Sequence, residues 1–223
     1  MKLLFLGCSW TYGTELGKEY QERRFSTLIG KNLNAEVVNY SRCGFSNHAN
    51  TRIFLEQDLE SFDKIIVQLT HPSRTEWYDS TGNFYRAKIK AKMATNMDLG
   101  KKWYREQIQK LGKKFEGDWD HILVDRERFL ITGNLLNGKE WWVHYYEEIY
   151  QDEYGLTEEM LFFNLIKNKL KRLKKDHLIL SINPKCTLPI DLQLNLPKYP
   201  RAKGNHPNEI GHSMIASDIM KLL

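Results

Sequence analysis

Two residues that together could perform nucleophilic catalysis stand near opposite ends of this sequence. Ser9 lies in Gly-Cys-Ser-Trp-Thr-Tyr-Gly at residues 7–13, after an apolar run, and His206 lies in Gly-Asn-His-Pro at residues 204–207. A serine hydroxyl is a weak nucleophile until a neighbouring base takes its proton. Histidine can take and return a proton near neutral pH. The two motifs therefore indicate serine-nucleophile chemistry, provided that the fold brings them together.

The elements that must position these residues follow from the hydrophobic pattern. Almost uninterrupted apolar runs predict strands at 2–6, 36–40, 63–70 and 177–182, and amphipathic spacing predicts helices at 24–33, 48–62, 157–175 and 209–222. Strands that alternate with helices, and that lack polar alternation, are typical of a parallel sheet covered on both faces. We therefore predict one α/β domain over residues 1–223, a three-layer α/β/α sandwich with a central parallel, flavodoxin-like sheet.

Ligands of open α/β sheets bind at the carboxyl ends of the strands, where the loops after successive strands meet. Ser9 follows the first predicted strand, Gly44 lies in the loop after the second, and Thr70 ends the third. The backbone N–H groups of Ser9 and Gly44 could stabilise an oxyanion there. Each residue also has a structural alternative, such as a helix cap or a turn glycine. His212, inside the predicted closing helix, is expected to be structural.

The segment from about 78 to 155 has no regular period, and we interpret it as a partly helical insertion. Between Arg86 and Lys114 it carries ten basic residues and two acidic ones. Such a charge could contact nucleic acid or an acidic polymer, but no nucleic-acid-binding motif accompanies it. A solvated surface is the alternative.

Composition narrows the class of protein. With 223 residues, 41% hydrophobic content and a net charge of +5, the chain can bury a sizeable core. No run is long enough for a membrane helix, and Met1–Leu6 is too short for a signal sequence, so we expect a cytoplasmic protein without membrane contact. The cysteines Cys8, Cys43 and Cys186 have no metal-ligand spacing. No metal or other cofactor is implied, and the oligomeric state stays open.

The order of the motifs resembles the SGNH (GDSL-type) hydrolases. In that family the first block carries the nucleophilic serine, which is similar to residues 7–11 here, with Cys8 where aspartate is usual. The second block supplies a glycine N–H to the oxyanion hole, as Gly44 would. The last block usually reads Asp-x-x-His-Pro, with histidine as the base, and residues 203–207 resemble it. The resemblance implies an α/β/α fold and an ester hydrolase with catalytic Ser9 and His206.

Two positions depart from the family pattern. Lys203 stands where the family has the aspartate that orients the histidine, and lysine cannot accept a hydrogen bond from imidazole. A backbone carbonyl or a loop carboxylate such as Asp191 could replace it. Residues 70–72 read Thr-His-Pro, without the asparagine that usually donates to the oxyanion hole, and Asn47 is a candidate substitute.

Three functions remain open. The first is hydrolysis of an ester, with an O-acetyl ester of a carbohydrate as the substrate that the family suggests, by a Ser9–His206 dyad through an acyl-enzyme. The second is a binding module of the same fold, without catalysis, for a glycan or a partner protein. The third is a nucleic-acid-associated protein that uses the basic segment.

Overall fold

The computed structural model describes residues 1–78, 122–125, 129–132 and 150–223. The chain divides into two compact units, which are Met1–Pro72 with Leu156–Leu223, and Ser73–Gly155. The candidate site residues all belong to the first unit, which is described first.

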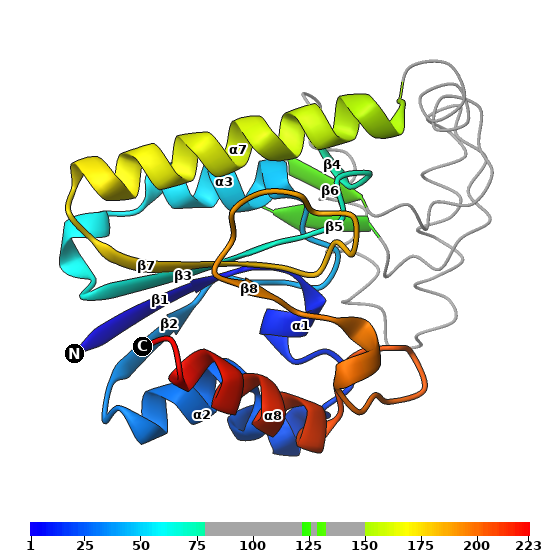
Figure 1. Ribbon diagram of the computed structural model, residues 1–223. Coiled ribbons are helices and arrows are strands. Elements are labelled where there is room, and N and C mark those ends of the chain that lie inside the picture. The colour runs from blue at the N-terminus through cyan, green and yellow to red at the C-terminus, as the bar shows by residue number, and fades with distance from the viewer. Residues whose placement is uncertain (79–121, 126–128, 133–149) are drawn as a thin grey trace, which may run out of the picture. The chain divides into compact units, whose positions relative to one another are not determined.

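A five-stranded parallel sheet forms the centre of the first unit (Figure 1). Its strand order is β2-β1-β3-β7-β8, the flavodoxin-like order, in which the chain changes direction between β1 and β3. The bounds of its strands are β1 Lys2–Leu6, β2 Glu36–Asn39, β3 Lys64–Leu69, β7 Asp176–Ser181 and β8 Leu192–Gln193. The prediction of a parallel α/β fold is therefore confirmed.

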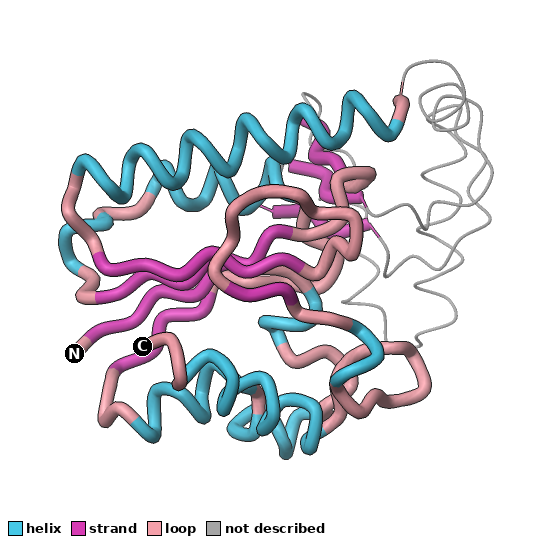
Figure 2. The backbone as a smooth tube through the Cα atoms, viewed as in Figure 1, coloured by secondary structure: helices cyan, strands magenta, loops and turns pink. Residues whose placement is uncertain are grey.

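Helices cover both faces of this sheet, as Figures 1 and 2 show. One face carries α2 and α8, and the other carries α3 and α7. Their bounds are α2 Phe25–Asn32, α8 Glu209–Met220, α3 Asn47–Glu56 and α7 Asp152–Arg172. Shorter helical turns are α1 Ser9–Tyr12, η1 Lys18–Arg23, η2 Leu59–Ser61 and η5 Leu196–Lys198.

The two-sided cover explains why the central strands show no polar alternation. All four residues from Leu3 to Leu6 are completely buried, and β3 is buried from Ile65 to Leu69. On one face Phe5 meets Phe25 of α2 edge-on, with ring centroids 6.2 Å apart. Since each strand residue must pack against a helix, both faces of β1 and β3 need apolar side chains.

The described part of the second unit contains a three-stranded antiparallel sheet, in the order β4-β6-β5. Its strands are β4 Thr75–Tyr78, β5 Ile122–Asp125 and β6 Phe129–Thr132. The sequence pattern predicts none of them, and it also misses β8 and α1. These pieces have only two to four residues each, which is too short for a periodic signal.

Two further expectations concern features outside this core. The whole basic stretch from Arg86 to Lys114, like most of the segment at 78–155, lies outside the described residues, so its role stays a prediction. In the described part of the chain, no helix is both long and apolar enough to cross a membrane.

Candidate functional site

Ser9 is held at the beginning of a single helical turn directly after β1. Cys8 precedes the turn in an extended conformation, and Ser9 is the first residue of α1. The turn closes because the amides of Gly13 and Thr14 both donate to the Ser9 carbonyl, at 3.1 and 3.0 Å. Gly13 adopts the left-handed conformation that ends the turn, with φ of +81°. The backbone around Ser9 is therefore fixed by local hydrogen bonds.

A buried polar contact attaches this turn to the neighbouring strand. Thr11 Oγ1 donates to Gln68 Oε1 at 2.5 Å, and Gln68 Nε2 donates to Cys8 Sγ at 3.1 Å. Gln68 is completely buried in β3, so both ends of its amide need partners. The contact joins the carboxyl ends of β1 and β3, where the strand order reverses and where sheets of this kind bind ligands.

Gly7 makes this arrangement possible because it has no side chain. A Cβ built on Gly7 would lie 2.3 Å from Thr11 Oγ1 and 2.9 Å from Thr11 Cβ. Thr11 can therefore fold back over residue 7 and reach Gln68 only when that residue is glycine. The glycine at position 7 of the first motif is therefore explained by steric fit, in addition to the chemistry suggested by Ser9.

The Gly44 loop is connected to the same turn through Asn39, the last residue of β2. The Asn39 amide nitrogen donates to the Thr11 carbonyl at 3.0 Å, and its oxygen accepts from the Ser41 amide at 2.9 Å. Gly44 has a φ of +80°, and its own N–H donates to no group in the described part of the chain.

His206 lies on a tight loop between η5 and α8. Arg201 and Pro207 form an antiparallel bridge, and the Ala202 amide donates to the His206 carbonyl at 2.9 Å. Asn205 takes a left-handed conformation at the bend, with φ of +67°. These backbone hydrogen bonds close the loop into a short hairpin that carries His206.

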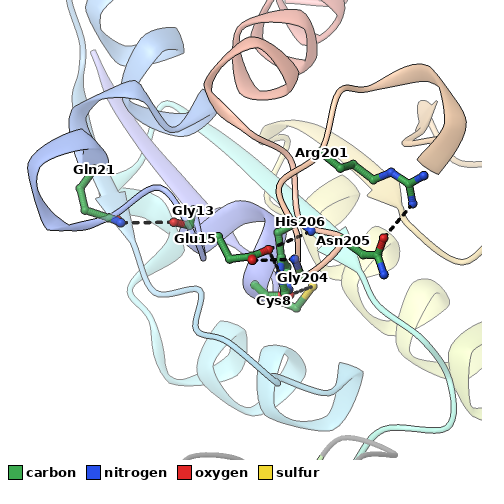
Figure 3. A network of polar contacts seen from close by, with 9 residues as sticks. Cys8, Gly13, Glu15, Gln21, Arg201, Gly204, Asn205 and His206 are labelled. Atoms are coloured by element: carbon green, nitrogen blue, oxygen red, sulfur yellow. Dashed lines mark hydrogen bonds and ion pairs between the residues drawn. The ribbon is translucent and has the colours of Figure 1, made fainter.

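The acid partner of His206 is Glu15, which stands six residues after Ser9. The imidazole Nδ1 lies 2.9 Å from Glu15 Oε2, and the same oxygen accepts from the His206 amide at 3.2 Å. The other oxygen, Oε1, accepts from the Gly204 amide at 2.7 Å. Figure 3 shows these three residues facing one another, and it draws Cys8, next to Ser9, in the same network.

This contact decides which nitrogen of His206 carries a proton. Partial burial raises the pKa of the Glu15 carboxyl, but the hydrogen bonds from His206 and Gly204 outweigh it and hold that pKa below its usual range. An ionised carboxylate can only accept, so Nδ1 must be the donor. In the neutral ring Nε2 then has a free lone pair, and no described residue donates a hydrogen bond to it. The described residues contain no hydrogen bond between His206 and the Ser9 hydroxyl, whose one polar contact is Cys8 Sγ at 3.8 Å.

Two of the predicted site residues have other contacts. The Asn47 amide binds the backbone of Thr70 from both ends, with its oxygen 2.8 Å from the Thr70 nitrogen and its nitrogen 3.2 Å from the Thr70 oxygen. Asn47 thus fastens α3 to the end of β3. The Asp191 carboxylate accepts from the Ile179 amide at 2.7 Å, directly before β8, whereas the carboxylate that contacts His206 is that of Glu15.

Sequence reasoning missed Glu15 and Gln68. A signal for Gln68 existed, because a single polar residue interrupts the apolar strand Ile-Ile-Val-Gln-Leu at 65–69. Glu15 gave no such signal, since it is one of many acidic residues and its partner lies 191 positions away. Only the lysine at position 203 indicated that an acid had to come from elsewhere.

His212 is buried against α2, as expected of a structural residue. Its Nδ1 accepts from the Phe25 amide at 3.2 Å, and its ring stacks on the Phe25 ring at 5.7 Å. Burial, followed by the charges of Arg24 and His206, lowers the pKa of His212 to about 4. The folded protein therefore keeps this ring neutral well below neutral pH.

A pH dependence of stability follows. The unfolded chain binds a proton at His212 below about pH 6.5, whereas the folded chain resists it down to about 4. We expect the free energy of unfolding to fall by about 3 kcal/mol from this residue as the pH drops through that window. Urea unfolding of wild type and His212→Asn between pH 7 and 4 measures it, since Asn keeps an acceptor for Phe25. Equal pH slopes in both proteins would contradict the assignment.

No protein-family model matches the chain, and a search of curated proteins gives no match. Among solved structures, a G-D-S-L family lipolytic protein from Veillonella parvula DSM 2008 aligns over 100% of this chain and 98% of its own, with 12% identity and a TM-score of 0.40. A psychrotrophic esterase from Pseudoalteromonas sp., inhibited by monoethylphosphonate, aligns over 99% and 94%, with 12% identity and a TM-score of 0.40.

A family two carbohydrate esterase from Clostridium thermocellum, in complex with cellohexaose, aligns over 99% of this chain and 62% of its own, with 12% identity and a TM-score of 0.39. At low identity, the chain is thus similar to G-D-S-L lipolytic proteins and esterases of known structure.

Proposed function

We propose that the protein is a serine hydrolase that cleaves an ester through an acyl-enzyme, with Ser9 as nucleophile and His206 as base. The observation that carries this proposal is the Glu15 contact, which leaves the Nε2 lone pair of His206 free. The contact also ties the His206 loop to the Ser9 turn, since Glu15 directly follows Thr14, whose amide binds the Ser9 carbonyl. This link between the two segments supports the proposal that Ser9 and His206 act together.

The chemistry follows from these groups. Ser9 Oγ attacks the ester carbonyl carbon while its proton passes to His206 Nε2. The carbonyl oxygen becomes an oxyanion, which the N–H groups of Ser9 and Gly44 stabilise. The bond to the alcohol oxygen then breaks, and the alcohol leaves with the proton from Nε2. A water molecule then attacks the acyl carbon while His206 takes one of its protons. The bond between the acyl carbon and Ser9 Oγ breaks, Oγ regains that proton from His206, and the carboxylic acid leaves and ionises in solvent.

The substrate that we propose is an O-acetyl ester of a carbohydrate. Its basis is the motif order of SGNH hydrolases at residues 7–11 and 203–207. An acetyl group is the smallest common acyl group, and it suits a nucleophile that is only 2% exposed.

A substrate series tests this function. We expect wild type to release p-nitrophenol from p-nitrophenyl acetate faster than from the butyrate or octanoate, and to release acetate from acetylated xylan. Ser9→Ala is the matched control, and p-nitrophenyl β-xyloside controls for glycosidase activity. Rates equal to those of Ser9→Ala on every ester would contradict the proposal.

One observation favours the alternative of a non-catalytic binding module for a glycan. The Ser9 hydroxyl makes no hydrogen bond to His206, although such bonds are often longer before substrate binds. Calorimetry with acetylated xylo-oligosaccharides separates the two functions. Binding without release of acetate would support the binding module.

A further inference from the structure

We infer that Glu15 is the positioning acid of the site. SGNH hydrolases usually have an aspartate for this role at the position of Lys203, and here the acid comes instead from the opposite end of the sequence. The inference rests on the proposed function and concerns how His206 is prepared for it. Three observations carry it, namely the convergence of donors on the carboxylate, the anchoring of its loop, and the space left by Gly204.

Three N–H donors converge on the two carboxylate oxygens of Glu15. They are the His206 ring, the His206 amide and the Gly204 amide, at 2.9, 3.2 and 2.7 Å. Since both oxygens accept, no neutral amide can replace the carboxylate. In either orientation its NH2 group would face another N–H donor. The geometry therefore requires an ionised acid, and not merely a polar side chain.

The loop that carries Glu15 is anchored at both sides. The Gln21 side chain donates to the carbonyls of Gly13 and Gly17, at 3.2 and 3.1 Å, and Figure 3 shows the first of these contacts. Glu15 itself has a φ of +72°, a left-handed conformation that residues with a side chain rarely adopt. A strained residue held in place by its surroundings, with its carboxylate on the candidate base, is typical of a functional position.

Gly204 provides the space for this carboxylate. A Cβ built on Gly204 would lie 2.5 Å from Glu15 Oε1 and 2.7 Å from Oε2. The end of a glutamate side chain can usually move away, but here three hydrogen bonds fix it. The glycine two residues before His206 thus belongs to the same arrangement as Glu15.

The consequence for His206 is a single tautomer. Glu15 holds the proton on Nδ1, so that Nε2 can accept the proton of the nucleophile. In Glu15→Gln the amide can donate to Nδ1 and stabilise the opposite tautomer, whose Nε2 carries the proton and cannot act as base. The substitution of glutamate by glutamine leaves the side chain nearly the same size, so it tests the charge and hydrogen bonding of Glu15 and not its packing.

Two measurements on wild type, Glu15→Gln and Gly204→Ala test this inference. The first is kinetics with p-nitrophenyl acetate, in which we expect kcat to fall about 10²–10³-fold with little change in KM, because Glu15 does not touch the substrate. The second is 15N NMR of the imidazole nitrogens, with His206 assigned from the His206→Gln spectrum. It should show the Nδ1–H tautomer in wild type and its loss in both variants.

Glu22→Gln is the matched control, because its exposed carboxylate pairs with Lys31, at 3.2 Å, and both measurements should stay at wild-type values. Wild-type kcat and an unchanged tautomer in folded Glu15→Gln would overturn the inference and leave the proposed function standing. If wild type hydrolyses no ester, the proposed function fails, and the tautomer alone decides the role of Glu15. If Glu15→Gln does not fold, Gly204→Ala replaces it in the test, because it keeps the acid but displaces its carboxylate. Wild-type kcat and an unchanged tautomer in folded Gly204→Ala would then overturn the inference.

Discussion

Replacing His206 by alanine is expected to lower kcat/KM for p-nitrophenyl acetate about 10⁴–10⁶-fold. Without the imidazole, the Ser9 hydroxyl has no base to take its proton, and the departing alcohol has no acid to protonate it. Stability should change little, because His206 is partly exposed and lies on a surface loop. Steady-state kinetics with thermal unfolding as a check on folding measures both effects.

The strongest form of this prediction concerns the pair of residues. If Ser9 and His206 act as a unit, as proposed, Ser9→Ala combined with His206→Ala should be no slower than either variant alone. His177→Ala is the control, since His177 lies near the amino end of β7, away from the carboxyl edge of the sheet. Multiplicative losses in the double variant, or an equal loss in His177→Ala, would show that Ser9 and His206 do not work together.

Gly7→Ala is expected to have the second largest effect, on both stability and activity. The new Cβ would overlap Thr11 Oγ1, at 2.3 Å, and overpacking of a buried site costs about 1–3 kcal/mol. If Thr11 moves, it loses its bond to Gln68 and shifts the turn that carries Ser9. A displacement of about 1 Å in a catalytic group lowers the rate about 10²-fold, so the folded variant should also be slow.

A double-mutant cycle identifies the cause. Thr11→Ala alone leaves the buried Gln68 oxygen without its donor and should cost about 1–3 kcal/mol. In the Gly7→Ala background the same change also removes the overlapping hydroxyl, so the double variant should be less destabilised than the sum of the two. Chemical denaturation of the four proteins provides the measurement. Additive free energies would mean that the Thr11 contact is not the reason for glycine at position 7.

The sequence alone was sufficient to predict four of the five strands of the parallel sheet and its main helices. Long apolar runs such as 2–6 and 63–70 have few alternatives to buried strands, and β1 and β3 lie within or at these bounds. The helix predicted at 48–62 is shorter in the structure, because α3 ends at Glu56 and a separate turn, η2, follows. Short elements whose pairing is set by tertiary contacts, such as β8, left no periodic trace.

The site was less predictable than the fold. Ser9, Gly44 and His206 were found because their types and order carry chemical meaning. Whether they form one catalytic site stays a proposal. Glu15 and Gln68 could not be assigned, since their roles depend on contacts across 191 and 57 positions. The position of Asn47 in the sequence makes it a candidate oxyanion donor. Its hydrogen bonds to the backbone N–H and C=O of Thr70 depend on the fold and could not be predicted.

The most direct test of the account is covalent labelling with a fluorophosphonate, followed by mass mapping of the modified peptide. An activated serine attacks the phosphorus with its Oγ and displaces fluoride, whereas ordinary serines do not react. We expect one adduct, on Ser9, which disappears in Ser9→Ala and in His206→Ala and forms more slowly in Glu15→Gln. Folded wild-type protein that remains unlabelled, or labelling of Ser9 that persists without His206, would contradict the proposal that these residues form a catalytic pair.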